Sequence, residues 1–348
     1  MSVTRYLENA WYFGGWADQL KAGEIKGVTI AGRAIALFRD EAGSLGAIGD
    51  RCPHRFAPLH MGKVRGSNVE CGYHGVQFGA DGRCAFNPHS KGATPSSVSV
   101  PSYPVVERDR AIWLWFSQSA EADPSLIPDM GWLSTIAATA IASVPTMHVK
   151  ADYQLLIDNL FDPVHADFLH AGTLGGNGLM TNARPTIRTG TYLVEADWKF
   201  DGQLAMPFLR HYLPGPEQID TWLTATWYAP TVVLVLGGIK PAGAPRDEGL
   251  WVASYHILTP AEEGKTTYDV MNVRNFAVDD AEMTQQKLKI SMNAFNNEDK
   301  PMIEAQYAAM KGQSLWDLKP ALLPIDTATV QVRRTLEALI DESLPAAA

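Results

Sequence analysis

Cysteine is scarce in this chain, with three residues among 348, too few for a disulfide framework. No run of 18 apolar residues without a charge occurs, so no transmembrane helix is expected. The first residues include Glu8 and no apolar signal core, which argues against export. These absences predict a cytoplasmic protein whose thiols are free for metal chemistry.

Basic residues are outnumbered, with 29 Lys and Arg against 38 Asp and Glu and a net charge of −9. A general nucleic-acid binder needs a basic surface, so this class is disfavoured. Hydrophobic residues make up 46% of the chain, which excludes disorder of the whole molecule. No GxGxxG unit or flavin motif occurs, so the chain is not expected to take hydride from NADH itself.

The length suits two domains of roughly 100–200 residues each. Short strand-length runs between turn residues predict an all-β domain over residues 1–118. The polar segment 117–124 predicts a linker. The remainder, 119–348, is predicted to be α+β, a sheet with flanking helices. Its expected strands are 191–200, 221–236 and 250–258, and its expected helices are 279–311 and 326–343.

Two matching Cys–His pairs are the most specific pattern in the chain. Cys52 and His54 form the first pair, and Cys71 and His74 form the second, with Pro or Gly beside each. A zinc site accepts two Cys and two His, but zinc fingers place both Cys before both His. In a Rieske [2Fe–2S] centre, two Cys hold one iron and two His hold the other. The order therefore favours a Rieske cluster over zinc or a chance arrangement. Cys84 fits neither pair and is expected to be a buried apolar residue.

A second candidate centre follows at Asp162, His165 and His170, with the spacing D-x₂-H-x₄-H. Two His and a later carboxylate form the facial triad of Fe(II) oxygenases. Positions five apart on a regular helix lie about 140° apart, so both rings reach one metal only if the helix is distorted. Pro163 predicts that distortion. Asp162, three residues before His165, is the expected partner of its ring.

The third iron ligand is expected well downstream, where Asp299 is favoured and Glu298 and other acids of 279–304 remain alternatives. Substrate-binding candidates are His256 on an expected strand and the pair Arg210 and His211, which could bind an anion. An ordinary structural role is an equal alternative for each of these three residues.

These motifs resemble the oxygenase components of Rieske non-haem iron oxygenases, especially the vanillate O-demethylase and dicamba monooxygenase group. The resemblance extends over nearly the whole chain. Its most specific parts are the metal motifs Cys52-Pro53-His54-Arg55-Phe56-Ala57-Pro58-Leu59, Cys71-Gly72-Tyr73-His74-Gly75 and Asp162 to His170, and Asp158-Asn159-Leu160 is a supporting match. Two stretches, 231–236 and 289–291, depart from the dicamba monooxygenase pattern, which argues against dicamba itself as the substrate.

The resemblance implies a Rieske domain followed by a helix-grip catalytic domain, an antiparallel sheet capped by helices. It implies cluster ligands Cys52, His54, Cys71 and His74, and mononuclear iron ligands His165, His170 and Asp299. Asp162 would connect His165 to His74 of the next subunit in a homotrimer or larger ring, and Asn159 would lie near Asp162.

The implied reaction is the oxidative O-demethylation of a methoxybenzoate-like, vanillate-type aromatic compound with release of formaldehyde. Dioxygen is the co-substrate, and electrons from NADH arrive through a separate reductase or ferredoxin. Methyl or ring hydroxylation of another aromatic compound remains an alternative. From a different class, a non-catalytic Rieske electron carrier and a zinc-binding interaction module also remain.

Overall fold

The computed structural model describes residues 5–117, 120–171, 178–204 and 206–343. The chain divides into two compact units, one formed by Glu8–Asp129 and the other by the residues from Met130 onward together with those before Glu8. The predicted boundary between residues 118 and 119 lies outside the described residues. Among the described residues, no helix combines the length and apolar character that crossing a bilayer requires.

The first unit consists of small antiparallel sheets joined by loops, in agreement with the all-β domain that the sequence predicts. The strand orders are β1-β10-β9, β2-β3-β4 and β5-β6-β7-β8. The strands are β1 (Ala10–Trp16), β2 (Ile25–Ile30), β3 (Arg33–Arg39), β4 (Leu45–Gly49), β5 (Lys63–Arg65), β6 (Asn68–Glu70), β7 (Gln77–Phe78), β8 (Cys84–Phe86), β9 (Val105–Arg108) and β10 (Ala111–Phe116).

One core of this unit collects the three cysteines among apolar side chains. Cys52, Cys71 and Cys84 are buried together with Phe38 and Phe78. Burial raises the pKa of the Cys84 thiol, so this residue stays a neutral, apolar side chain. The expectation that Cys84 is a buried apolar residue is confirmed.

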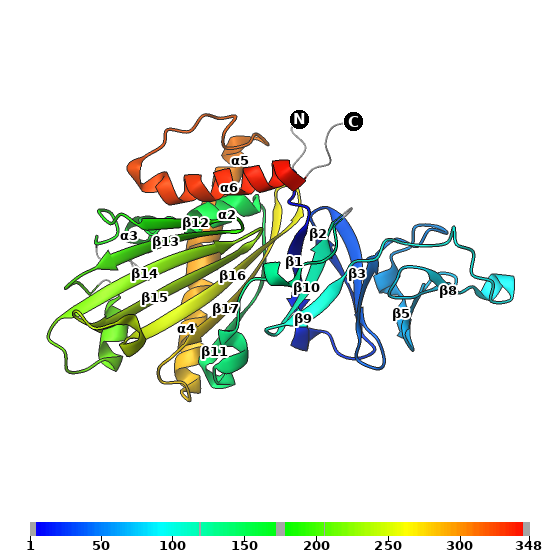
Figure 1. Ribbon diagram of the computed structural model, residues 1–348, viewed down its shortest axis with the longest axis horizontal. Coiled ribbons are helices and arrows are strands. Elements are labelled where there is room, and N and C mark those ends of the chain that lie inside the picture. Colours follow the sequence, from blue (N-terminus) through cyan, green and yellow to red (C-terminus); the bar gives the residue numbers. More distant parts are fainter. Residues whose placement is uncertain (1–4, 118–119, 172–177, 205, 344–348) are drawn as a thin grey trace. The chain divides into compact units, whose positions relative to one another are not determined.

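The second unit is built on one seven-stranded antiparallel sheet in the order β11-β17-β16-β15-β14-β13-β12 (Figure 1). Its strands are β11 (Ile141–Val149), β12 (Thr186–Gly190), β13 (Leu193–Phe200), β14 (Ile219–Tyr228), β15 (Val232–Pro241), β16 (Leu250–Glu262) and β17 (Lys265–Arg274). The single strand predicted over 221–236 is wrong. A turn at Ala229–Thr231 divides it into β14 and β15. Apolar residues stand on both sides of the turn, so the two strands were predicted as one.

The helices of the second unit are α1 (Trp132–Thr135), α2 (Tyr153–Leu160), α3 (His165–Phe168), α4 (Ala281–Asn293), α5 (Lys300–Met310) and α6 (Thr327–Ser343). The long helix predicted over 279–311 is α4 and α5 joined by a π-helical segment, η8 (Ala294–Asp299). Asp280 caps α4, because its carboxylate accepts a hydrogen bond from the Met283 amide at 2.9 Å. The predicted α+β class is confirmed.

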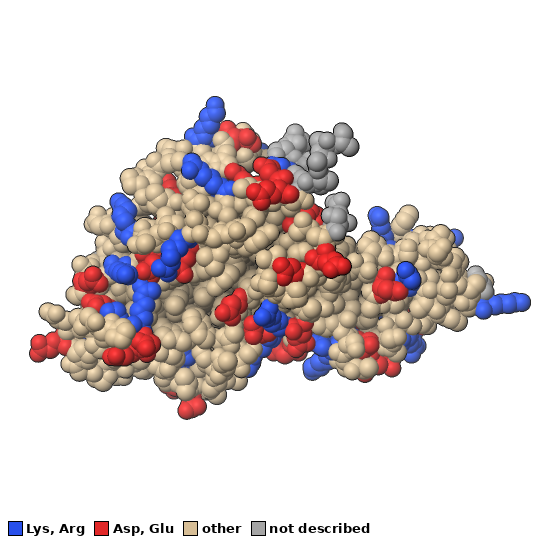
Figure 2. Space-filling view, viewed as in Figure 1, with Lys and Arg blue, Asp and Glu red and all other residues tan. Residues whose placement is uncertain are grey.

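One face of the sheet supports the helices that hold the site. Side chains alternate between faces along a strand, so Tyr268, Asn272 and Arg274 of β17 point to the same side. Helix α4 packs across this side of the sheet (Figure 1), where Arg274 donates to Thr284 Oγ1 at 2.6 Å. On the face shown in Figure 2, acidic and basic side chains are interspersed without a large basic patch, in keeping with the net charge of −9.

Candidate metal centres

Two loops of the same construction present the Cys–His pairs. The Cys52 amide donates to the Ala57 carbonyl at 2.9 Å, and the Cys71 amide donates to the Val76 carbonyl at 2.8 Å. Within each loop, the fourth residue after the cysteine has a positive φ, 60° at Phe56 and 73° at Gly75. The amide of each of these residues donates to the carbonyl of its cysteine. Both loops therefore turn back on themselves in the left-handed conformation.

The four candidate ligands converge from these loops. The rings of His54 and His74 have centroids 4.6 Å apart. Burial raises the pKa of the Cys52 thiol and the adjacent Cys71 thiol adds to this, whereas the amides of His54 and Arg55 hydrogen-bond to the sulfur and lower it. Such N–H donors stabilise a metal-bound thiolate. His89 contacts the His74 carbonyl through Nε2 at 2.8 Å.

Burial differs between the two ligand types. Cys52 and Cys71 are each 2% exposed, whereas His54 is exposed and His74 is half-buried. A [2Fe–2S] cluster held here would have its cysteine-bound iron inside the unit and its histidine-bound iron at the surface. Two buried thiols and two imidazoles from matching loops fit a Rieske cluster, and the histidine edge is the side from which an electron partner can approach.

The helix that leads to the histidines of the second centre is broken before the first of them. Helix α2 ends at Leu160, and one helical turn, α3, resumes at His165. The predicted distortion around Pro163 is present. His165 is the first residue of α3, and His170 lies in the turn after α3 ends at Phe168. Their rings have centroids 5.0 Å apart.

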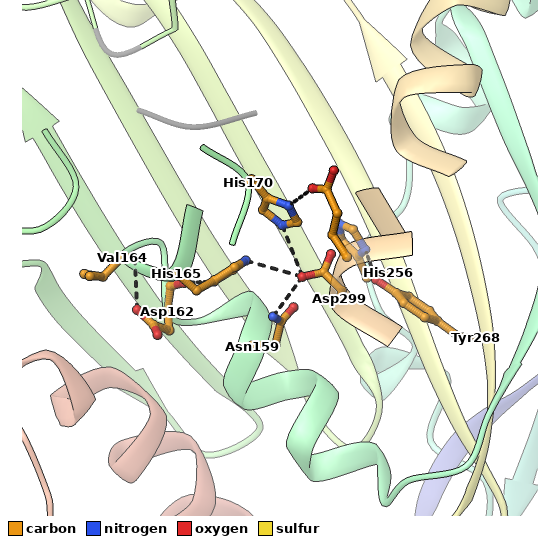
Figure 3. A network of polar contacts seen from close by, with 9 residues as sticks. Asn159, Asp162, Val164, His165, His170, His256, Tyr268 and Asp299 are labelled. Atoms are coloured by element: carbon orange, nitrogen blue, oxygen red, sulfur yellow. Dashed lines mark hydrogen bonds and ion pairs between the residues drawn. The ribbon is translucent and has the colours of Figure 1, made fainter. Parts of the chain in front are cut away.

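Asp299 completes this cluster (Figure 3). Its Oδ1 lies 3.1 Å from Nε2 of His170 and 3.6 Å from Nε2 of His165. Ligand atoms of all three residues lie within 4.8 Å of one another. His170 and Asp299 are each 4% exposed. Two imidazoles and one carboxylate in this arrangement fit a mononuclear Fe(II) with further positions open.

The π-helical segment explains why two adjacent acids have different partners. Asp299 is the last residue of η8, and a π-turn at a functional site rotates side chains away from their regular helical directions. Glu298 lies against Nδ1 of His170, on the opposite side of the ring from Asp299. Among the acids of 279–304 that the sequence left open, Asp299 thus belongs to the cluster of ligand atoms, and Glu298 orients a ligand.

Asn159 and Asp162 contact the site differently from what the resemblance implies. The Asn159 amide donates to Asp299 Oδ1 at 3.1 Å (Figure 3), so Asn159 supports the carboxylate ligand. Nδ1 of His165 contacts the main-chain carbonyl of Asp162. The Asp162 carboxylate instead accepts from the Val164 amide at 2.9 Å. The expected contact between Asp162 and His165 is therefore made through the backbone, because the carboxylate caps the turn that opens α3.

A buried aromatic cluster adjoins the triad. Nδ1 of His256 lies 2.7 Å from the Tyr268 hydroxyl, and the Phe295 ring packs edge-on against both rings. Burial lowers the pKa of His256 to about 3, although the charge of Asp299 opposes this, so the ring is neutral. Tyr268 and Phe295 were missed by sequence reasoning; the alternation of inward residues on β17 could have indicated Tyr268.

Arg210 and His211 lie on the 3₁₀-helix η6 (Pro207–Tyr212). Arg210 donates to the Leu213 carbonyl and, at 2.8 Å, to the Pro216 carbonyl. The exposed His211 ring packs edge-on against Tyr212. These contacts give Arg210 a structural role in closing its own loop.

Family comparisons agree with both centres. Residues 10–104 match the Rieske [2Fe-2S] domain, and residues 149–342 match the vanillate O-demethylase oxygenase C-terminal domain. This chain is a Rieske oxygenase. The second match includes His165, His170 and Asp299, and the first includes both Cys–His pairs.

Similar proteins span the whole length of this Rieske oxygenase. The chloroacetanilide N-alkylformylase oxygenase component of Rhizorhabdus wittichii is 37% identical, over 96% of each chain. The dicamba O-demethylase oxygenase component of Stenotrophomonas maltophilia is 34% identical, over 98% of this chain and 99% of its own. A crystal structure of dicamba monooxygenase with non-haem iron and dicamba superposes with a TM-score of 0.83 at 33% identity, covering 97% of this chain and 98% of that chain.

Proposed function

We propose that this chain is the terminal oxygenase component of a multicomponent monooxygenase that removes an alkyl group, most simply an O-methyl group, from a small aromatic compound. The convergence of His165, His170 and Asp299 in a chain that also contains a Rieske domain is the observation on which this function rests. One of the two relatives described above is named an N-alkylformylase and the other an O-demethylase. These names support the removal of an alkyl group over ring hydroxylation.

Cys52, His54, Cys71 and His74 would hold the [2Fe–2S] cluster, and His165, His170 and Asp299 would hold the mononuclear iron. When bound, these groups supply single electrons and the activation of dioxygen. Residues 1–118 would form the domain that holds the [2Fe–2S] cluster, and residues 119–348 would form the domain that holds the mononuclear iron.

The chain's own residues position the ligands and shield the site. Glu298 keeps Nε2 of His170 directed at Asp299, and Asn159 holds the Asp299 carboxylate. His256 stays neutral beside the triad, so it can exchange a hydrogen bond with a phenol or carboxylate without bringing a charge into the buried site. Hydroxylation of an O-methyl carbon yields a hemiacetal, which releases formaldehyde and leaves a phenol.

Electron delivery requires partner proteins. We propose a reductase, with or without a ferredoxin, because the chain has no nucleotide or flavin motif of its own. A homotrimer would bring His74 of one subunit close to Asp162 of the next. The exposed position of His54 supports an approach from outside the unit. A cytoplasmic location is proposed from the low cysteine content.

Formaldehyde release from a panel of methoxybenzoates, with NADH and a Rieske-oxygenase reductase, tests the function. Iron and sulfide analysis should find about three irons and two acid-labile sulfides per chain. His165→Ala should retain the cluster's visible spectrum and lose turnover. Surviving turnover in that variant would favour a site other than this triad, and zinc without sulfide would favour an interaction module.

A further inference from the structure

His89 lies against the second cluster loop, although neither Cys–His pair includes it. Strand β8 ends at Phe86, which pairs with Gln77 at the start of β7. Because the two strands run antiparallel, the residues after Phe86 run back along the residues before Gln77, which are those of the loop 71–75. His89 follows Phe86 by three residues and thereby reaches His74 of that loop.

One ring nitrogen of His89 bonds to the main chain of a cluster ligand. Its Nε2 lies 2.8 Å from the carbonyl oxygen of His74. A carbonyl oxygen can only accept a hydrogen bond, so the hydrogen is on Nε2 and His89 is the donor. The two rings also pack edge-on, with centroids 6.1 Å apart and planes at 73°. His89 therefore restrains both the peptide group and the imidazole of His74.

The turn that carries His89 is itself held in place. The Asn87 side chain accepts a hydrogen bond from the His89 amide at 3.0 Å and caps the 3₁₀ turn η3 (Pro88–Ser90). Pro88 fixes its own φ at the start of this turn. The Gly92 amide donates to the Asn87 carbonyl at 3.1 Å. These bonds close the turn on both sides of His89, so the local backbone determines where its ring lies.

A cavity of about 370 Å³ lies at the histidine edge of the cluster loops. Its lining includes His54 and His74 from the two loops, and Asn87 and His89 from the turn that follows β8. His89 is thus a third imidazole beside the two that would hold one iron of the cluster. Imidazole ligands are neutral and thiolates are anionic, so an added electron is repelled less on this side.

We propose that His89 is a positioning residue for the cluster ligand His74, and that its N–H raises the reduction potential of the [2Fe–2S] cluster. The partial positive charge of this donor would lie on the side where an added electron is repelled least, which favours the reduced form. The same hydrogen bond would keep the His74 imidazole in one orientation toward its iron. This inference rests on the cluster ligands of the proposed function and not on the identity of the substrate.

The test measures the reduction potential of the holoprotein by spectroelectrochemical titration of the cluster absorbance. His89→Phe keeps a ring of similar size and removes the N–H, so the potential should become more negative. The equilibrium constant for reduction of the cluster should fall by about twofold to tenfold, the range expected for one hydrogen bond. His89→Gln supplies an N–H again and should recover most of the shift. The electron paramagnetic resonance spectrum of the reduced cluster should change in His89→Phe, because the His74 ring loses its restraint.

Phe86→Leu is the matched control, because Phe86 is 42% exposed just before the same turn and its side chain has no hydrogen-bonding group; its potential should equal the parent's. Iron and sulfide analysis ensures that the compared proteins carry the same cluster. An unchanged potential in His89→Phe, or the same shift in His89→Gln or Phe86→Leu, would overturn the inference. A shift that depends on the N–H in a protein that releases no formaldehyde would refute the proposed function and leave the role of His89 standing.

Discussion

Glu298 lies against one ring nitrogen of His170, and Asp299 lies 3.1 Å from the other. Two consecutive acids thus contact opposite sides of one imidazole. This is possible because η8 gives them directions that a regular helix would not. The pair fixes both the rotation of the ring and the nitrogen that is free for a metal.

Removing the Glu298 carboxylate should loosen the mononuclear iron and spare the cluster. Glu298→Ala frees the His170 ring to rotate, and loss of such a partner typically costs tenfold to a hundredfold in metal affinity. Iron retained after dialysis, measured with the cluster absorbance as an internal reference, checks this. Glu282→Ala, an exposed acid in the first turn of α4, is the control. Equal iron retention in both variants would contradict the role given to Glu298.

A buried ion pair joins α6 to the helix that precedes the site. Arg333 Nε lies 2.9 and 3.0 Å from the two carboxylate oxygens of Asp158, the residue before Asn159. Arg333→Met leaves this carboxylate buried without its cation, which should destabilise the protein by about 3–5 kcal/mol. The double variant Arg333→Met, Asp158→Leu should recover most of that loss.

Thermal unfolding of the three proteins measures the difference, with the exposed neighbour Arg334→Met as control. If the double variant were as unstable as Arg333→Met, the loss would come from packing and not from the unpaired charge.

The matching cluster loops predict opposite effects of substitutions at equivalent positions. Phe56, 68% exposed, has a φ of 60°, and Gly75 has a φ of 73°. An L-residue with a side chain pays about 1 kcal/mol or more in this conformation. Phe56→Gly should therefore raise the thermal midpoint, and Gly75→Ala should lower it. Unfolding followed by cluster absorbance is the measurement, and a fall in both midpoints would show that the Phe56 ring contributes more than its backbone costs.

His256 predicts a loss of stability on acidification. Its pKa is about 3 in the folded protein and near 6.5 when unfolded. As the pH falls, the unfolded chain therefore takes up a proton on this ring before the folded protein does. The contribution of neutral His256 to the free energy of unfolding is complete above pH 6.5 and declines as the pH falls toward 3. By pH 5 the decline amounts to about 2 kcal/mol.

The difference in unfolding midpoint between pH 7 and pH 5 should be smaller in His256→Asn than in the parent protein, because Asn does not titrate. Comparing this difference between the two proteins cancels the contribution of the titratable groups that they share. An identical difference in both would mean that His256 is charged, or accessible to solvent, in the folded state.

The sequence predicted the metal-binding chemistry where it depends on residues that are close together in the chain. The members of each metal motif lie within a few residues of one another: the Cys–His pairs at 52–54 and 71–74, and the histidines at 165 and 170. Their order and spacing alone therefore limit which metal centre they can form. Helix α6, whose apolar residues recur at helical spacing, was also predicted closely. Strands β14 and β15 were predicted as one strand, because apolar residues stand on both sides of the short turn between them.

What depends on distant residues was decided only by the fold. Asp299 became distinguishable from Glu298 through a π-helical turn whose hydrogen-bonding pattern leaves no mark in residue spacing. Asn159 lies 140 residues from the carboxylate that it supports. The sequence by itself determined which atoms can bind metal; the tertiary structure decided which of them meet, because side-chain direction depends on how helix and sheet pack together.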